Sequence, residues 1–191
     1  MVGCRREVPE QALAELRRAG EFDPLNILLQ AAVGGRLLRL GRWEEGVELL
    51  RKAVATEPNI PLAHRYLWTA FDKRGMHDEA VAEAKTFWTL AGQPDIAEAV
   101  PRDYKERGYQ WAMKQAADKL ADRAKRTYIQ PTQIAAVYAH AGETDRSLEW
   151  LERAYAIRDT WLVFLKDDPR FDPLRSDPRF QGLVRRMNFP A

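Results

Sequence analysis

Four glycines recur along the chain at a nearly constant spacing. Gly41, Gly75, Gly108 and Gly142 follow one another at intervals of 34, 33 and 34 residues. Each glycine ends one amphipathic stretch and is followed by another, and glycine readily adopts the left-handed conformation that terminates a helix. Internal repeats of this length are typical of stacked helix pairs. The spacing therefore predicts an all-α chain, and no alternation of period two calls for a β-strand.

Apolar and small residues stand at fixed offsets from each glycine, as expected if each helix pair packs in the same way. The positions eight and four residues before the glycines are Val33 and Leu37, Leu67 and Phe71, Val100 and Tyr104, and Ile134 and Tyr138. The positions five, nine and twelve residues after them are Gly46, Leu50 and Ala53; Ala80, Ala84 and Phe87; Met113, Ala117 and Leu120; and Ser147, Leu151 and Ala154. These positions are predicted to face the core.

The pattern divides residues 1–191 into one helical repeat domain. We expect a lone helix at 9–20, repeats at about 25–60, 61–94, 95–127 and 128–160, and a C-terminal helical cap at 161–189. The lone helix matches the second helix of a repeat, so the chain is either a fragment of a longer protein or carries a capping helix here. Pro101 lies within a predicted helix and is expected to kink or shorten it.

The residues around Gly34 to Pro58 resemble the tetratricopeptide repeat. They include Gly34, the linker Gly41-Arg42-Trp43, Ala53 and the closing Glu57-Pro58-Asn59. This family has a small residue and an aromatic in its first helix, followed by alanine, aromatic and proline. The resemblance implies a right-handed superhelical solenoid of antiparallel helix pairs. The repeat at 95–127 departs most from the family pattern.

The tail contains the sequence Asp-Pro-Arg-Phe twice, at 168–171 and 177–180. Aspartate accepts hydrogen bonds from the free amides of a first helical turn and proline is tolerated there, so each copy predicts a capped helix start. The ending is similar to the C-terminal ends of repeat arrays in bacterial signalling proteins, which follow serine/threonine kinase, adenylate cyclase or winged-helix regulator domains. None of those domains is present in these residues.

Composition narrows the classes of function. Charged residues make up 30% of the chain and apolar ones 46%, an ordinary globular balance, and no apolar run approaches the roughly 20 residues that span a bilayer. We expect a cytoplasmic protein without a signal peptide. The most basic stretch, 114–126, also carries Asp118 and Asp122, so no one-sided basic stripe predicts nucleic-acid binding. A single cysteine, Cys4, excludes an internal disulfide.

No constellation of residues predicts catalysis. His64, His77 and His140 fall in different repeats, the first and last in first helices and His77 in a turn, without a further ligand at metal-binding spacing. Gly34-Gly35 lies inside an apolar helix and lacks the lysine of a phosphate-binding loop, so close helix packing explains it. The six tryptophans are placed at packing offsets. We therefore expect no catalytic residues, metal or cofactor.

The remaining candidate is the inner groove that stacked pairs form, lined by the first helix of each repeat. Helical spacing places one set of residues on the outward stripe of the second repeat, with others on later first helices. The candidate partner-binding residues are Arg65, Tyr66, Thr69, Asp72, Lys73, Arg102, Thr132, Gln133 and His140. A simply solvated surface is the alternative interpretation.

The sequence thus predicts a protein- or peptide-binding repeat module, most plainly a regulatory or scaffolding part of a bacterial signalling protein, and not an enzyme. The alternative is a structural, self-associating module that forms a homodimer through the lone helix. The partner and any fused domain do not follow from a repeat architecture.

Overall fold

The computed structural model describes residues 11, 13–18, 23 and 26–189. Every regular element in this part of the chain is a helix, which confirms the all-α prediction. The chain divides into two compact units, Met1–Ala97 and Glu98–Ala191, and the boundary falls inside one helix. None of the described helices is long and apolar enough to cross a bilayer. The single continuous solenoid stays a prediction, and each unit is described separately.

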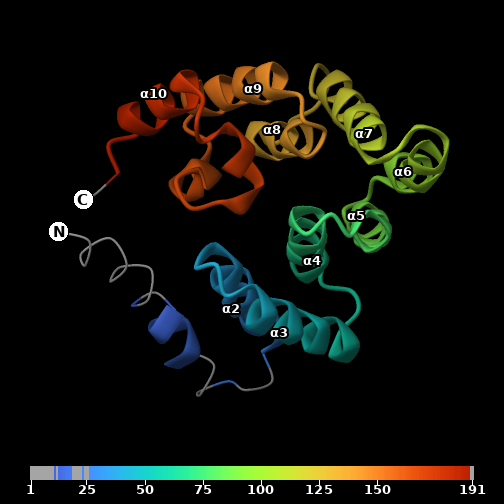
Figure 1. The fold of residues 1–191 in the computed structure, drawn as a ribbon, viewed down its shortest axis with the longest axis vertical. Helices are drawn as coiled ribbons and strands as arrows, with labels where there is room; N and C mark the ends of the chain where they lie inside the picture. The colour runs from blue at the N-terminus through green and yellow to red at the C-terminus, as the bar shows by residue number, and fades with distance from the viewer. Residues whose placement is uncertain (1–10, 12, 19–22, 24–25, 190–191) are drawn as a thin grey trace. The chain divides into compact units, whose positions relative to one another are not determined.

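The helices of the first unit form two successive pairs. Their bounds are α2 (Ile27–Arg39), α3 (Trp43–Thr56), α4 (Pro61–Lys73) and α5 (His77–Leu90). Each pair packs side by side, α2 with α3 and α4 with α5, and α4 also packs on both α2 and α3 (Figure 1). Gly41 and Gly75, which follow α2 and α4, have φ of 76° and 69°, so the predicted left-handed turn is confirmed.

Close packing of α2 on α3 depends on two helical glycines. A methyl group on Gly34 would lie 2.7 Å from Leu50 Cγ, and one on Gly46 would lie 2.8 Å from Leu38 Cδ2 and 3.0 Å from the Gly34 carbonyl oxygen. Real Cβ atoms do not approach other atoms so closely, so larger residues would push the helices apart. This confirms close helix packing as the role of Gly34.

An aromatic cluster fills the space between α4 and α5. Trp68, Phe87 and Trp88 are buried, and their ring centroids are 4.8 to 6.0 Å apart. Such tilted and edge-on contacts add to the hydrophobic stabilisation of the pair. The packing role predicted for the tryptophans is confirmed for these two and for Trp150, which is also buried.

Helical residues 13–18 precede α2, and the expected helix at 9–20 extends beyond the described residues at both ends. Leu13 is buried against Val33 and Leu37 of α2, with Leu16 partly buried beside it. These residues pack on the apolar face of α2, an arrangement compatible with both a capping helix and a fragment of a longer array.

The second unit begins within α6 (Pro94–Arg107) and continues with α7 (Tyr109–Arg123), α8 (Pro131–His140) and α9 (Thr144–Ala156). The helices α8 and α9 pack together, and α7 packs on α8. Pro101 lies inside α6, which is 14 residues long, so the expected shortening at this proline is wrong, and the expected kink stays a prediction. Proline has no N–H to donate to the helix, but α6 continues past it to Arg107.

The fixed-offset core residues are buried in both units, with the single exception of the half-buried Tyr104. Ser147, at a small-residue position of α9, is buried and donates a hydrogen bond from Oγ to the Ala135 carbonyl oxygen at 2.7 Å. The spacing from the repeating glycines therefore predicted the core correctly.

The tail folds into the 3₁₀ helices η1 (Thr160–Phe164) and η2 (Pro169–Leu174), followed by α10 (Pro178–Arg186). The side chains of Asp168 and Asp177 each accept a hydrogen bond from the backbone N–H two residues later, so both predicted caps are confirmed. Phe171 and Phe180 are 2% and 3% exposed, with ring centroids 6.5 Å apart. The segment packs on α8 and α9 and covers the end of the second unit.

Candidate binding surfaces

Five of the predicted groove residues lie on α4 in the first unit. Thr69 is buried, and its hydroxyl donates a hydrogen bond to the Arg65 carbonyl oxygen at 3.0 Å. Of the five residues, only Lys73 is exposed. Arg65, Tyr66 and Asp72 are half-buried. The face thus offers less free surface than helical spacing predicted.

Tyr66 has a packing role that the sequence did not reveal. A methyl group on Gly35 of α2 would lie 2.3 Å from two Tyr66 ring carbons, so the ring occupies the space that the glycine leaves. The Arg65 guanidinium lies 5.3 Å from the centroid of the same ring. Tyr66 therefore packs α4 against α2, although helical spacing places it on the outward stripe of the second repeat.

The other four predicted groove residues belong to the second unit. Arg102 is exposed and bonded to Asp103 at 2.8 Å, and this hydrogen bond raises the pKa of the guanidinium above its ordinary value. Gln133 is half-buried on α8. Thr132 and His140, at the two ends of α8, are both buried. Their burial places them away from the solvated surface expected of groove residues.

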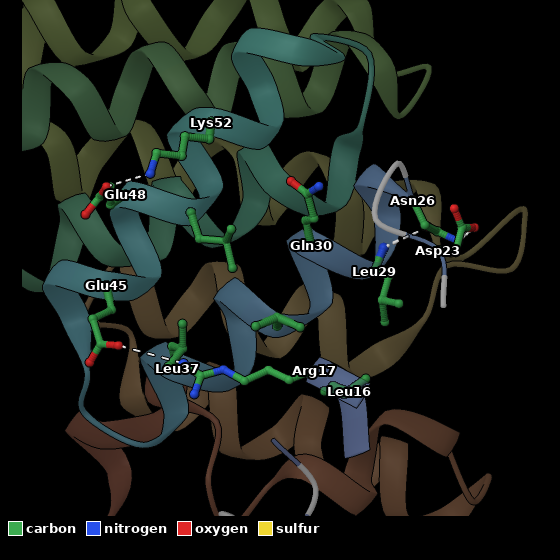
Figure 2. Close-up of a pocket in the computed structure, with 12 residues that line it drawn as sticks. Leu16, Arg17, Asp23, Asn26, Leu29, Gln30, Leu37, Glu45, Glu48 and Lys52 are labelled. Atoms are coloured by element: carbon green, nitrogen blue, oxygen red, sulfur yellow. Dashed lines mark hydrogen bonds and ion pairs between the residues drawn. The ribbon is translucent and has the colours of Figure 1, made fainter. Parts of the chain in front are cut away.

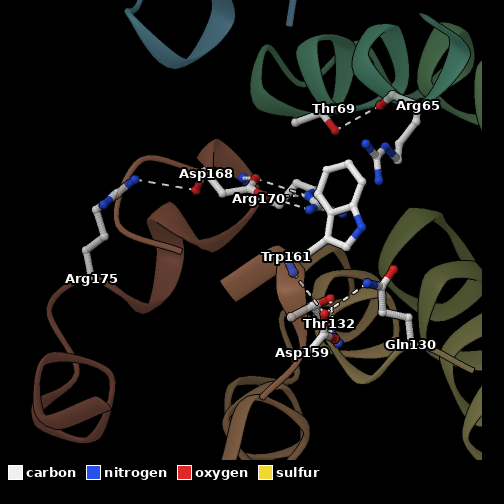
Figure 3. A network of polar contacts seen from close by, with 9 residues as sticks. All are labelled: Arg65, Thr69, Gln130, Thr132, Asp159, Trp161, Asp168, Arg170 and Arg175. Atoms are coloured by element: carbon white, nitrogen blue, oxygen red, sulfur yellow. Dashed lines mark hydrogen bonds and ion pairs between the residues drawn. The ribbon is translucent and has the colours of Figure 1, made fainter. Parts of the chain in front are cut away.

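Thr132 belongs to a hydrogen-bond network centred on the buried Asp159 (Figure 3). Asp159 Oδ2 accepts from the Thr132 backbone N–H at 3.1 Å and from its hydroxyl at 2.8 Å. Oδ1 accepts from Gln130 Nε2 at 2.9 Å and from the Trp161 backbone N–H at 3.0 Å. One carboxylate therefore holds the start of α8 and the start of the tail together.

His64 makes hydrogen bonds through both ring nitrogens. Nδ1 is 2.6 Å from Oε2 of Glu83 on α5, and Nε2 is 2.8 Å from the Pro58 carbonyl oxygen. Both partners offer oxygen acceptors, so this geometry favours the protonated ring, in which both nitrogens donate. Burial lowers the pKa of His64, but the hydrogen bonds to Glu83 and Pro58 outweigh it and raise the pKa. The pair links the start of α4 to α5.

Replacing His64 by glutamine should therefore remove a pH-dependent part of the stability. A raised folded-state pKa adds stability that is complete below the unfolded pKa of about 6.5 and is lost as pH rises through the folded value. The unfolding free energy of wild type minus that of His64→Gln should be largest near pH 6 and should fall as pH rises above about 6.5 through the folded-state pKa. Urea denaturation from about pH 6 upward measures it, and a difference that does not change with pH would mean that folding does not raise the pKa of His64.

The first unit also contains a hollow of about 550 Å³ between residues 13–18 and the α2–α3 pair (Figure 2). Its apolar lining comes from three elements and consists of Leu16, Leu29, Val33, Leu37 and Leu49. Its rim is polar, with Glu48 paired to Lys52 at 2.7 Å and Glu45 3.8 Å from Arg17. Asp23, Asn26 and Gln30 complete the lining. We call this hollow the leucine pocket.

The sequence contained a signal for the leucine pocket that groove reasoning passed over. Leu29, Val33 and Leu37 are spaced by four residues along one stripe of α2, so Leu29 continues the buried face by one turn. Residues 13–18 cover Val33 and Leu37 more completely than Leu29, which is only half-buried. Leu29 is therefore the least buried of the three residues on this stripe.

Within the described part of the chain, no three histidine, cysteine, aspartate or glutamate side chains are grouped so as to hold a metal ion. A scan against protein-family models found no match, and a search of curated proteins found no significant similarity. The tetratricopeptide resemblance is therefore a prediction from the residues alone.

Proposed function

We propose that the chain is a protein- or peptide-binding helical repeat module, and that the leucine pocket is its contact for apolar side chains of the partner. The observation that carries the proposal is the half-covered apolar stripe of α2. A pocket of this volume lies in the range of known ligand sites, which combine an apolar lining with a few polar groups at the edge. The resemblance to repeat arrays of bacterial signalling proteins supports a regulatory or scaffolding role.

The rim of the pocket suits a peptide better than a small apolar molecule. Asn26 caps α2 by accepting a hydrogen bond from the Leu29 backbone N–H at 3.0 Å, so the backbone at the mouth is fixed. Gln30 and the ion pairs around the mouth offer donors and acceptors to a peptide backbone while the leucines take its side chains. Buried apolar anchors surrounded by a polar rim are the usual arrangement at protein interfaces.

Two neighbouring leucines provide a matched test. Leu29 lines the pocket, whereas Leu28 is 58% exposed and does not line it. A peptide selected from a random displayed library against the wild-type chain should bind Leu29→Lys at least tenfold more weakly, a loss of about 1.4 kcal/mol or more, because the charge enters the apolar lining. Binding by Leu28→Lys should be unchanged, as measured by fluorescence anisotropy.

Circular dichroism melts of both variants control for folding. Equal binding by Leu29→Lys and wild type, or a loss only in Leu28→Lys, would show that the leucine pocket is not the contact. Sedimentation at several concentrations separates the alternative: a dimer that forms in wild type and dissociates in Leu29→Lys would replace peptide binding by self-association as the function of this surface.

A further inference from the structure

The second unit contains a groove of about 340 Å³ between α7 and α9. It is lined by Ala121 of α7, by Ala124 directly after that helix, by Trp150 of α9 and by Tyr138 of α8. The groove is remote in sequence from the leucine pocket and shares no residue with it.

The charges at the inner end of this groove are balanced. Asp118 accepts hydrogen bonds from the Tyr138 hydroxyl at 2.7 Å and from Lys114 Nζ at 2.6 Å. Burial raises the pKa of Asp118, but these hydrogen bonds outweigh it and lower the pKa. Asp118 is thus an ionised carboxylate neutralised by Lys114, and it adds no net charge to the groove.

The charged residues that line the groove, together with the exposed residues paired to them, carry more positive than negative charge. Lys125 and Arg126 share the single carboxylate of Asp122, at 3.0 and 3.4 Å, and Arg146 and Arg153 share that of Glu149, at 3.8 and 2.6 Å. These two carboxylates and four cations are all exposed in the described unit. Two positive charges therefore remain uncompensated within these pairs.

The dipole of α9 does not explain the position of Arg146. Lys125 and Arg126 follow the C-terminus of α7, where the helix dipole favours cations, but Arg146 lies in the first turn of α9, where the dipole disfavours them. Its guanidinium lies 5.9 Å from the Tyr138 ring centroid, and that of Arg153 lies 4.4 Å from the Trp150 ring centroid. The rings hold both guanidinium groups along the same groove with their side chains still half-exposed to solvent.

We propose that the groove between α7 and α9 binds an acidic peptide segment of a partner protein. Glutamate and aspartate side chains match the bidentate donors of Arg146 and Arg153, and Ala121 and Ala124 leave room for small apolar side chains of the peptide. This surface is separate from the leucine pocket, and the proposal does not rest on the function assigned to that pocket.

The test uses the full chain and a labelled peptide of glutamate and alanine, with counterparts in which glutamine or lysine replaces glutamate. The glutamate peptide should bind more tightly than both counterparts, and its affinity should fall as salt is added, because exposed charges are screened over about 10 Å at 0.1 M. The double variant Arg146→Glu with Arg153→Glu should bind it at least tenfold more weakly.

The matched control, Lys105→Glu with Lys166→Glu, makes the same change in net charge at exposed positions of the same unit away from the groove. This control should keep more than half of the wild-type affinity for the glutamate peptide. Leu29→Lys should keep all of that affinity, so failure of the groove proposal is distinguishable from failure of the leucine-pocket proposal. Equal loss in the control pair, or equal binding of the glutamine peptide, would overturn the proposal. Tighter binding of a single-stranded oligonucleotide, lost in Arg146→Glu with Arg153→Glu, would overturn it in favour of nucleic acid.

Discussion

Replacing Asp159 by alanine should destabilise the second unit by about 3–5 kcal/mol, because buried donors left without an acceptor each cost about 1–3 kcal/mol. The change removes the acceptor of four hydrogen bonds, two of them from the buried Thr132. Asparagine at this position keeps one acceptor oxygen and should cost less. Urea denaturation followed by circular dichroism measures the unfolding free energy of the second unit in both variants.

Asp167 provides the control for this prediction. It is exposed and lies one residue before the Asp168 cap, so Asp167→Ala changes the same net charge and should stay within about 0.5 kcal/mol of wild type. If Asp159→Ala were as stable as Asp167→Ala, the carboxylate would not be the link between α8 and the tail.

Replacing Phe171 by alanine should destabilise the second unit by about 3–5 kcal/mol, the usual loss for truncating a buried aromatic side chain. Phe171 is almost completely buried against Phe180 and the end of the helix pair. Phe180→Ala should fall in the same range. Because the two rings are in contact, the double variant should lose less than the sum of the single changes. Thermal and urea melts of the three variants measure these losses.

Val163, in the same tail and 60% exposed, is the matched control. Val163→Ala should leave the melting temperature nearly unchanged, since little apolar surface becomes exposed. A melting temperature for Phe171→Ala equal to that of Val163→Ala would show that the tail does not act as a cap.

The sequence predicted the features that depend on local patterns. The glycine spacing predicted the helix ends, and the positive φ of Gly41 and Gly75 is a property of each turn itself. The caps at Asp168 and Asp177 likewise need only the residues that follow them. Core positions at fixed offsets were predictable because one helical stripe must face its neighbour.

Contacts that join different repeats were not predictable in the same way. Tyr66 stands 31 residues after Gly35, and the contact between them depends on how far α4 is rotated against α2. Asp159 reads as a residue after a helix end, and its partners Gln130 and Thr132 are 29 and 27 residues away. Several predicted groove residues are buried for this reason, because helical spacing shows which residues share a face but not which neighbouring helix covers that face.

The leucine pocket is tested most directly by methyl NMR of the chain with a peptide selected against it. We predict that the methyl resonances of Leu16, Leu29, Val33, Leu37 and Leu49 shift as the peptide is added, while those of Leu162 and Leu174, buried in the tail of the second unit, stay in place. A saturated complex in which the pocket methyl resonances do not shift would contradict the proposal that this chain binds its partner through the leucine pocket.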